Sequence, residues 1–309
     1  MKLDQPATSG APSTKNRLRP SPQQYKTYVA VAGISLAMIV FTGAAVRLTQ
    51  AGLGCEDWPA CNDQSLTPEW ELHGWIEFGN RLISGVVAIA TSLAVLTAYR
   101  RQPYRSDLVR WSWGLVAGTV AQIFLGGATV LLRLHPAVVG AHYLLSMILL
   151  WNVVVLWFKA SAPGPAATPA VSPRQQNLGR LVLALATLVA VLGTVATGTG
   201  PNAGDPEAER LPFVFQSVVQ NHSISVWVFL AATIVLAITL QTQPESAANT
   251  RAPTKVVRML LAVSLLQGAI GYTQYFRGVP PLLVELHIVG AVSVWVLTVG
   301  LYLSMFNRN

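Results

Sequence analysis

The stretch GWIEFGNRLISGVVAIATSLAVLTAY, residues 74–99, decides the fold class. No charged residue occurs from Leu82 to Tyr99, and a helix needs roughly 20 apolar residues to cross the hydrocarbon core of a bilayer. Similar runs recur along the chain, so the expected spans are 28–48, 77–99, 112–132, 137–158, 178–198, 217–240, 256–275 and 282–304. The sequence lacks the alternating segments of about ten residues that are typical of membrane β-barrels. We therefore expect an all-α integral membrane protein with eight transmembrane helices.

Composition and charge agree with a membrane protein. Of the 309 residues, 52% are hydrophobic and only 11% are charged, whereas soluble domains carry about 25% charged residues. Most of the 21 Lys and Arg residues lie in the N-terminal tail and in alternate connections, and the acidic residues gather in the others. Because cytoplasmic connections are rich in Lys and Arg, we expect a multi-pass protein of the cell membrane with both termini in the cytoplasm. The net charge of +8 follows this topology and forms no aromatic-interleaved patch, so the expected partner is the lipid bilayer and not a nucleic acid.

An internal repeat divides the chain into two halves. Four residues recur at an offset of 145: Gln122, Gly126, Pro136 and His142 match Gln267, Gly271, Pro281 and His287. The sequence therefore predicts two pseudo-symmetric four-helix bundles, related by an axis along the membrane normal because each half has an even number of spans. The expected parts are a disordered cytoplasmic tail at 1–24, an N-terminal half at 25–159, a cytoplasmic linker at 160–177 and a C-terminal half at 178–309.

Three of the five histidines, His142, His222 and His287, lie inside expected spans, about five residues from their outer ends. At about 1.5 Å per residue this is a depth of roughly 7–8 Å, where a polar residue either hydrogen-bonds between helices or serves a function. His222 and His287 lie on alternate helices of one half, which suits the two axial positions of a haem iron. Zinc would need three or four ligands, and no Cys or carboxylate cluster accompanies them.

Four glycines on the neighbouring expected helices would let a flat macrocycle approach the backbone: Gly126, Gly127, Gly268 and Gly271. Small residues of this kind also serve ordinary helix packing in membranes, and both interpretations stay open.

The first half differs from the second because Asn80 takes the place of His222. It offers one imidazole, His142, together with Glu77 and Arg81, and residues three or four apart share a helix face. Two interpretations stay open. Glu77 and Arg81 form an ion pair at the membrane interface, or they line a pocket in which the carboxylate handles protons and the cation binds a propionate.

The two cysteines, Cys55 and Cys61, lie together in an acidic outer loop. A disulfide is expected there because the exterior is oxidising, and the C-x5-C spacing excludes the C-x-x-C-H haem-attachment motif. The bond would act as a structural clasp, or in a redox or haem-handling role above the first pocket.

Several motifs together resemble the haem A synthase family: VRLTQAGLGCEDWPAC at 46–61, IEFGNR at 76–81, LHPAVVGAH at 134–142, and one His in each of the sixth and eighth spans. The resemblance covers about residues 28–304. It implies eight helices in two four-helix halves and oxidation of the C8 methyl of haem O to a formyl group, which gives haem A for terminal oxidases. It also implies haem B in the C-terminal half and the substrate haem O in the N-terminal half.

The resemblance further implies roles for single residues. Glu77 matches the family's functional glutamate, Arg81 its arginine and His142 the substrate-side histidine, whereas Asn80 stands where the family pattern usually has His, as in actinobacterial-type sequences. The remaining matches are the haem B ligands His222 and His287 and the outer-loop cysteine pair Cys55 and Cys61.

The implied partners are a haem O synthase (a farnesyltransferase) that supplies the substrate, a terminal oxidase that accepts the product, and an electron donor that the sequence does not identify. Whether the chain forms a homo-oligomer stays open. Two other function classes are considered: a di-haem b-type quinol oxidoreductase, and a haem transporter or chaperone. The first would require a ligand pair in each half, which Asn80 breaks.

Overall fold

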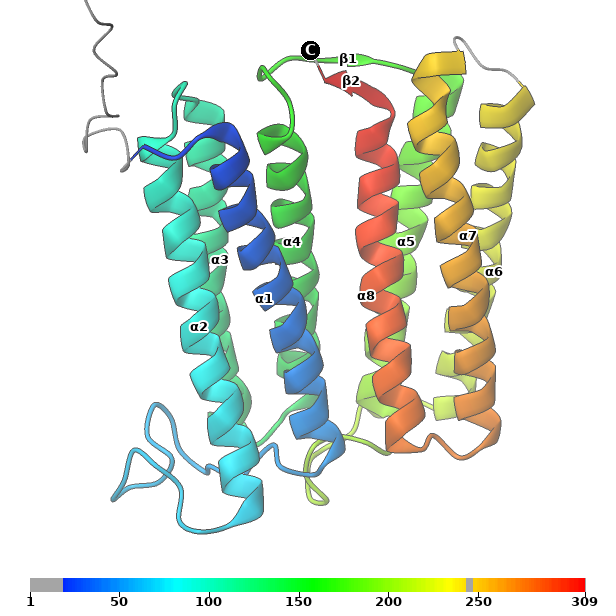
Figure 1. Cartoon of the computed structure of the whole chain (residues 1–309). Helices are drawn as coiled ribbons and strands as arrows, with labels where there is room; N and C mark the ends of the chain where they lie inside the picture. Colours follow the sequence, from blue (N-terminus) through cyan, green and yellow to red (C-terminus); the bar gives the residue numbers. More distant parts are fainter. Residues whose placement is uncertain (1–18, 243–246, 309) are drawn as a thin grey trace, which may run out of the picture.

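The computed structural model describes residues 19–242 and 247–308 of the chain, and it is almost entirely helical (Figure 1). Eight helices within these residues are long and apolar enough to cross a membrane, which confirms the predicted fold class. They are α1 (Pro22–Leu48), α2 (Leu72–Arg100), α3 (Ser106–Leu131), α4 (Pro136–Ala160), α5 (Pro173–Thr199), α6 (Phe215–Thr242), α7 (Ala247–Phe276) and α8 (Pro281–Ser304).

The predicted starts of several helices were wrong by about one turn or more. α2 begins at Leu72 instead of 77, and α5 begins at Pro173 instead of 178, inside the predicted linker. Hydropathy detects only the apolar part of a helix, whereas the first turn is stabilised by capping. Ser172 and Gln175 form a capping box with Pro173 at the first helical position, and Ser21 does the same with Gln24 at the start of α1. α1 therefore begins inside the predicted tail, of which residues 1–18 lie outside the described part.

The helices gather as α1–α4 on one side and α5–α8 on the other (Figure 1). In each group consecutive helices pack against each other and the first packs against the fourth. This places α2 opposite α4, and α6 opposite α8. The two-domain division and the pseudo-symmetry axis stay predictions.

Each group has an apolar core, and polar contacts join the groups along their length. The indole N–H of Trp295 on α8 donates to the carbonyl of Met147 on α4 at 2.8 Å. At the end of α1, Nη2 of the half-buried Arg47 donates to the carbonyl of Thr197 at the end of α5, also at 2.8 Å. The groups therefore meet through α1, α4, α5 and α8.

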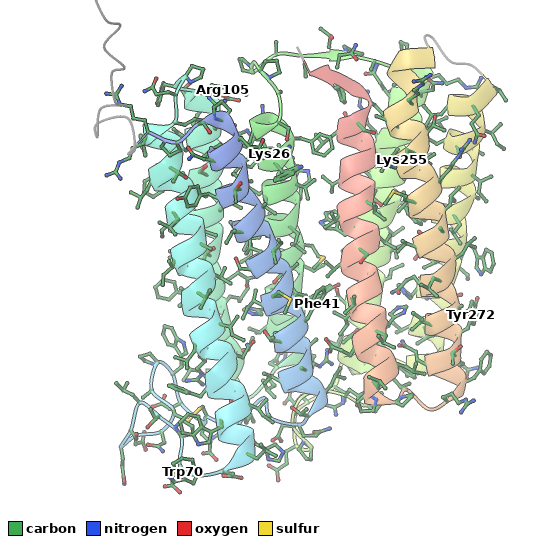
Figure 2. All side chains as sticks on the ribbon, viewed as in Figure 1. Lys26, Phe41, Trp70, Arg105, Lys255 and Tyr272 are labelled. Carbon is green, nitrogen blue, oxygen red and sulfur yellow. A yellow bond between two sulfur atoms is a disulfide. The ribbon has the colours of Figure 1, made fainter. Side chains whose placement is uncertain are left out.

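The two ends of the molecule differ in charge. Lys26, Arg105 and Lys255 lie at the end where α1 begins, and Trp70 lies at the opposite end (Figure 2). At the basic end, strand β1 (Ala167–Pro169) of the linker pairs antiparallel with β2 (Phe306–Arg308), with Thr168 opposite Asn307. The connection between the two groups is thus tied to the C-terminal segment. Its cytoplasmic location stays a prediction.

Candidate functional site

The three histidines of the expected site lie six or seven residues after the first residue of their helices, slightly deeper than predicted. His142 lies on α4, His222 on α6 and His287 on α8. The last two belong to helices that stand at opposite corners of their group.

Each imidazole lies against a glycine of the preceding helix. A methyl group added to Gly126 of α3 would lie 3.2 Å from Cε1 of His142. The corresponding distances are 3.0 Å from Gly193 of α5 to His222 and 2.9 Å from Gly271 of α7 to His287. Such distances are tighter than most Cβ contacts, so an alanine at any of the three positions would press on the ring, most of all at Gly271.

The fourth equivalent position carries Asn80, opposite Gly43 of α1. Here the added methyl would lie 3.9 Å from Nδ2, which is ordinary contact. The amide is held by Thr42, whose hydroxyl donates to Oδ1 of Asn80 at 2.7 Å. Asn80 therefore occupies the corner opposite His142 with a fixed amide in place of a second imidazole.

Two glutamines support the histidine-bearing helices in the same way. Nε2 of Gln122 donates to the carbonyl of His142 at 3.0 Å, and Nε2 of Gln267 donates to the carbonyl of His287 at 2.6 Å. In both glutamines Oε1 is buried and lacks a hydrogen-bond partner among the described residues. The contact that pairs each Gln with a His 20 residues later is thus the same in both groups.

The imidazoles themselves carry buried polar atoms without protein partners. Within residues 19–242 and 247–308, Nδ1 of His142, His222 and His287 is buried and makes no hydrogen bond. Buried polar atoms are normally satisfied, so such an orphan calls for an explanation. In the same part of the chain, no group of three or more His, Cys, Asp and Glu side chains comes together to hold a metal ion. Two imidazoles on opposite helices, without further protein ligands, fit the axial ligand set of a haem.

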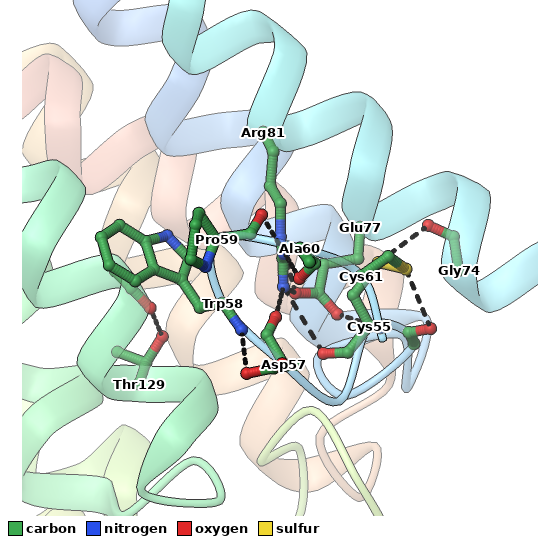
Figure 3. Close-up of polar contacts among 12 residues, drawn as sticks. Cys55, Asp57, Trp58, Pro59, Ala60, Cys61, Gly74, Glu77, Arg81 and Thr129 are labelled. Carbon is green, nitrogen blue, oxygen red and sulfur yellow. Dashed lines mark hydrogen bonds and ion pairs between the residues drawn. A yellow bond between two sulfur atoms is a disulfide. The ribbon is translucent and has the colours of Figure 1, made fainter. Parts of the chain in front are cut away.

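Glu77 and Arg81 form the predicted ion pair one helical turn apart on α2, and they also hold the outer loop (Figure 3). Nη2 of Arg81 lies 2.6 Å from Oε1 of Glu77, and Nε lies 3.2 Å from the same oxygen. The other oxygen, Oε2, accepts the backbone N–H of Cys55 at 2.8 Å. The carboxylate is only 5% exposed, so it is a buried group with all its visible partners in α2 and the loop.

The guanidinium of Arg81 also donates hydrogen bonds to backbone carbonyls of the loop. Nη1 donates to the carbonyls of Ala60 at 2.9 Å and Pro59 at 3.4 Å, and Nη2 donates to the carbonyl of Asp57 at 3.0 Å. All three nitrogens therefore donate within the protein, as the ion-pair interpretation expects. The propionate contact stays a prediction. The loop is closed by the Cys55–Cys61 disulfide, as predicted.

Sequence reasoning missed Trp58, whose indole leaves this loop and lies against α3 (Figure 3). A methyl on Gly127 would come within 2.5 Å of its ring. Gly127 thus accommodates Trp58 and not a histidine. At Gly268, the other predicted glycine of this kind, no described heavy atom lies within 4 Å of such a methyl.

Two further glycines of the site, Gly43 and Gly193, were also missed. The signal for them was present in the sequence, because they lie in the glycine-rich ends of the first and fifth spans, which are similar.

Comparison with known proteins identifies a family for the chain. The family model described as "Cytochrome oxidase assembly protein" matches residues 26–299. Among individual relatives, a "Heme A synthase" of Geobacillus kaustophilus is 35% identical over 109 residues, which cover 34% of this chain and 33% of that protein. A "Heme A synthase" of Halalkalibacterium halodurans is 24% identical over 172 residues, 55% of this chain and 58% of that protein. The alignments thus span less than two thirds of each relative.

The family match covers all eight helices, whose length and apolar composition make the chain a multi-pass membrane protein. The chain belongs to the cytochrome oxidase assembly protein family.

Proposed function

We propose that the chain is a haem A synthase, a membrane oxidoreductase that converts the C8 methyl of haem O to a formyl group. The observation that carries the proposal is the set of three half-buried imidazoles, each lying against a glycine and each with a buried Nδ1 that lacks a hydrogen-bond partner among the described residues. The family and the names of the similar relatives support the same activity.

His222 and His287 would hold a resident haem B, because they come from opposite helices of the second group. A haem held by two imidazoles would supply electron transfer. The chain's own contribution is to orient the rings. Gly193 and Gly271 let them approach the helix backbone, and Gln267 fixes the carbonyl of the helix turn that carries His287.

The first group would receive haem O as the substrate, bound through His142. Asn80 cannot replace an imidazole as an iron ligand, and Thr42 holds its amide. Conversion of a methyl to a formyl group removes protons and electrons and adds one oxygen atom. Glu77 is the candidate for proton handling, since it is a buried carboxylate at the outer end of the group. A di-haem electron carrier would need a ligand pair in each half, so the contacts of Asn80 favour the synthase.

The partners follow from the proposed reaction. A haem O synthase would supply the substrate, a terminal oxidase would accept haem A, and a separate donor or acceptor would exchange electrons with the second group. The basic end of the helices would face the cytoplasm, because Lys and Arg are enriched on that side of membrane proteins. The Cys55–Cys61 loop would then lie outside the cell membrane.

Co-expression with a haem O synthase, in a host that makes no haem A, tests the proposal. Pyridine haemochrome spectra and mass analysis of extracted haems should find haem B with the purified protein and haem A in the membranes. His222→Ala and His287→Ala should each remove haem B, whereas Trp70→Ala, at a 98% exposed outer-loop residue, should retain it. A folded, colourless protein would overturn the proposal, and a normal haem A yield from Glu77→Ala would remove Glu77 from the reaction.

A further inference from the structure

Trp58 is wedged between the outer loop and α3. Its ring lies so close to Gly127 that an added methyl would come within 2.5 Å of Cδ2 and 2.7 Å of Cε2. It also lies near Phe124, one turn before Gly127 on α3, with ring centroids 6.1 Å apart. A large indole therefore rests directly on the backbone of a transmembrane helix, although it belongs to a loop.

This contact adjoins the candidate substrate site. Gly126, the residue before Gly127, is the glycine on which His142 rests. Successive residues of a helix point about 100° apart, so Trp58 and His142 lie on adjoining faces of the same turn of α3. The two aromatic rings thus lie against consecutive glycines at the same level of α3.

Hydrogen bonds from α2 hold the loop backbone directly before and directly after Trp58. Arg81 donates to the carbonyl of Asp57, directly before Trp58, and to those of Pro59 and Ala60, directly after it. Glu77 orients this guanidinium and also accepts the N–H of Cys55. These bonds determine where the indole can lie.

We propose that Trp58 is a substrate-positioning residue, whose indole forms a side wall of the haem O site beside His142. Glu77 and Arg81 then act on the substrate partly through Trp58, as the residues that hold its loop. An indole suits this role because it offers a large, rigid apolar surface at small entropic cost, and a porphyrin is a flat apolar ring. The inference rests on the proposed function and adds to it a residue that contacts the substrate.

The test compares variants of the full-length chain in the co-expression system, with haem O, haem A and haem B measured per mole of purified protein. Trp58→Ala should lower the ratio of haem A to haem O by about tenfold, since loss of positioning slows a reaction by one to two orders of magnitude. Trp58→Phe should restore most of the ratio. Trp70→Ala, which removes an exposed indole from the same loop, should leave it unchanged. Haem B content and the Cys55–Cys61 disulfide should be unaffected in all three variants.

Gly127→Ala provides an independent test. Its methyl displaces the indole, whereas the sequence of the loop is unchanged. It should lower the ratio in the otherwise unaltered chain but add little in the Trp58→Ala background, since both changes act through the same contact. If Trp58→Ala does not accumulate, Gly127→Ala alone decides. Normal ratios in either variant, or additive effects in the double variant, would overturn the inference. Absence of haem A from the unaltered chain would instead refute the proposed function.

Discussion

Gly271→Ala tests the seating of the imidazoles most directly. An alanine methyl at 271 would lie 2.9 Å from Cε1 and 3.4 Å from Nδ1 of His287. Carbon atoms in good contact are about 3.5–4.0 Å apart, so the ring has to move by roughly 0.6 Å or α7 and α8 have to separate. Overpacking of this kind costs about 1–3 kcal/mol. The better helix propensity of alanine offsets about 1 kcal/mol of it.

Gly268→Ala is the matched control, because it lies one turn earlier on α7 and a methyl there meets no described heavy atom within 4 Å. It receives the same gain in helix propensity without the clash. The two variants should therefore differ in the position of His287 and not in the intrinsic stability of α7.

Haem B per mole of purified protein is the assay, measured by pyridine haemochrome with the thermal unfolding midpoint alongside. We expect Gly271→Ala to lower the haem content by about fivefold, the factor that corresponds to a net cost of roughly 1 kcal/mol. Gly268→Ala should keep the haem content and unfold at the same or a higher temperature. Equal haem contents in the two variants would refute the reasoning that glycine is needed to seat the ring.

Three other predictions concern the first group. Glu77→Ala leaves a largely buried guanidinium without its carboxylate and should lower the free energy of unfolding by about 3 kcal/mol, measured by thermal unfolding; an unchanged midpoint would contradict the pairing. Replacing both Cys55 and Cys61 with Ser should cost about 2 kcal/mol, the estimate for a short closed loop, and should abolish the effect of reductant on the unfolding midpoint. Asn80→His supplies the missing second imidazole, so the first group should retain more haem per protein, with a six-coordinate low-spin spectrum; an unchanged haem ratio and spectrum would argue against the assigned corner.

Much of the fold was predictable because a bilayer requires long apolar helices, and such runs are visible without tertiary information. The starts of α1 and α5 were not predicted, since their first turns are polar and are stabilised by capping boxes. Ser21 and Ser172 were nevertheless readable as caps, because each precedes a Pro and lies three residues before a Gln. The pairing of the linker with the C-terminal segment depends on how the two groups dock, which no local pattern encodes.

The part of the site that was predictable is the part in which the internal sequence repeat reflects the same contact in both groups of helices. The offset that relates Gln122 and His142 to Gln267 and His287 corresponds to the same hydrogen bond in both groups. Trp58 could not be found in this way, because the contact exists in one half only and joins a loop to a helix distant in sequence. A glycine next to Gly126 without a repeat partner was the one available signal.

The difference between Asn80 and His222 explains how two similar groups of helices can serve different roles. Under the proposed function, a haem held by both His222 and His287 would be suited to staying bound and exchanging electrons. In the first group the opposite corner carries an amide that Thr42 holds in place, so a haem there would meet an imidazole from His142 alone. A substrate must enter and its product must leave, and release often limits turnover. We infer that replacing one imidazole by an amide lowers haem retention enough for exchange, and that contacts such as Trp58 supply the orientation that a second axial ligand would otherwise provide.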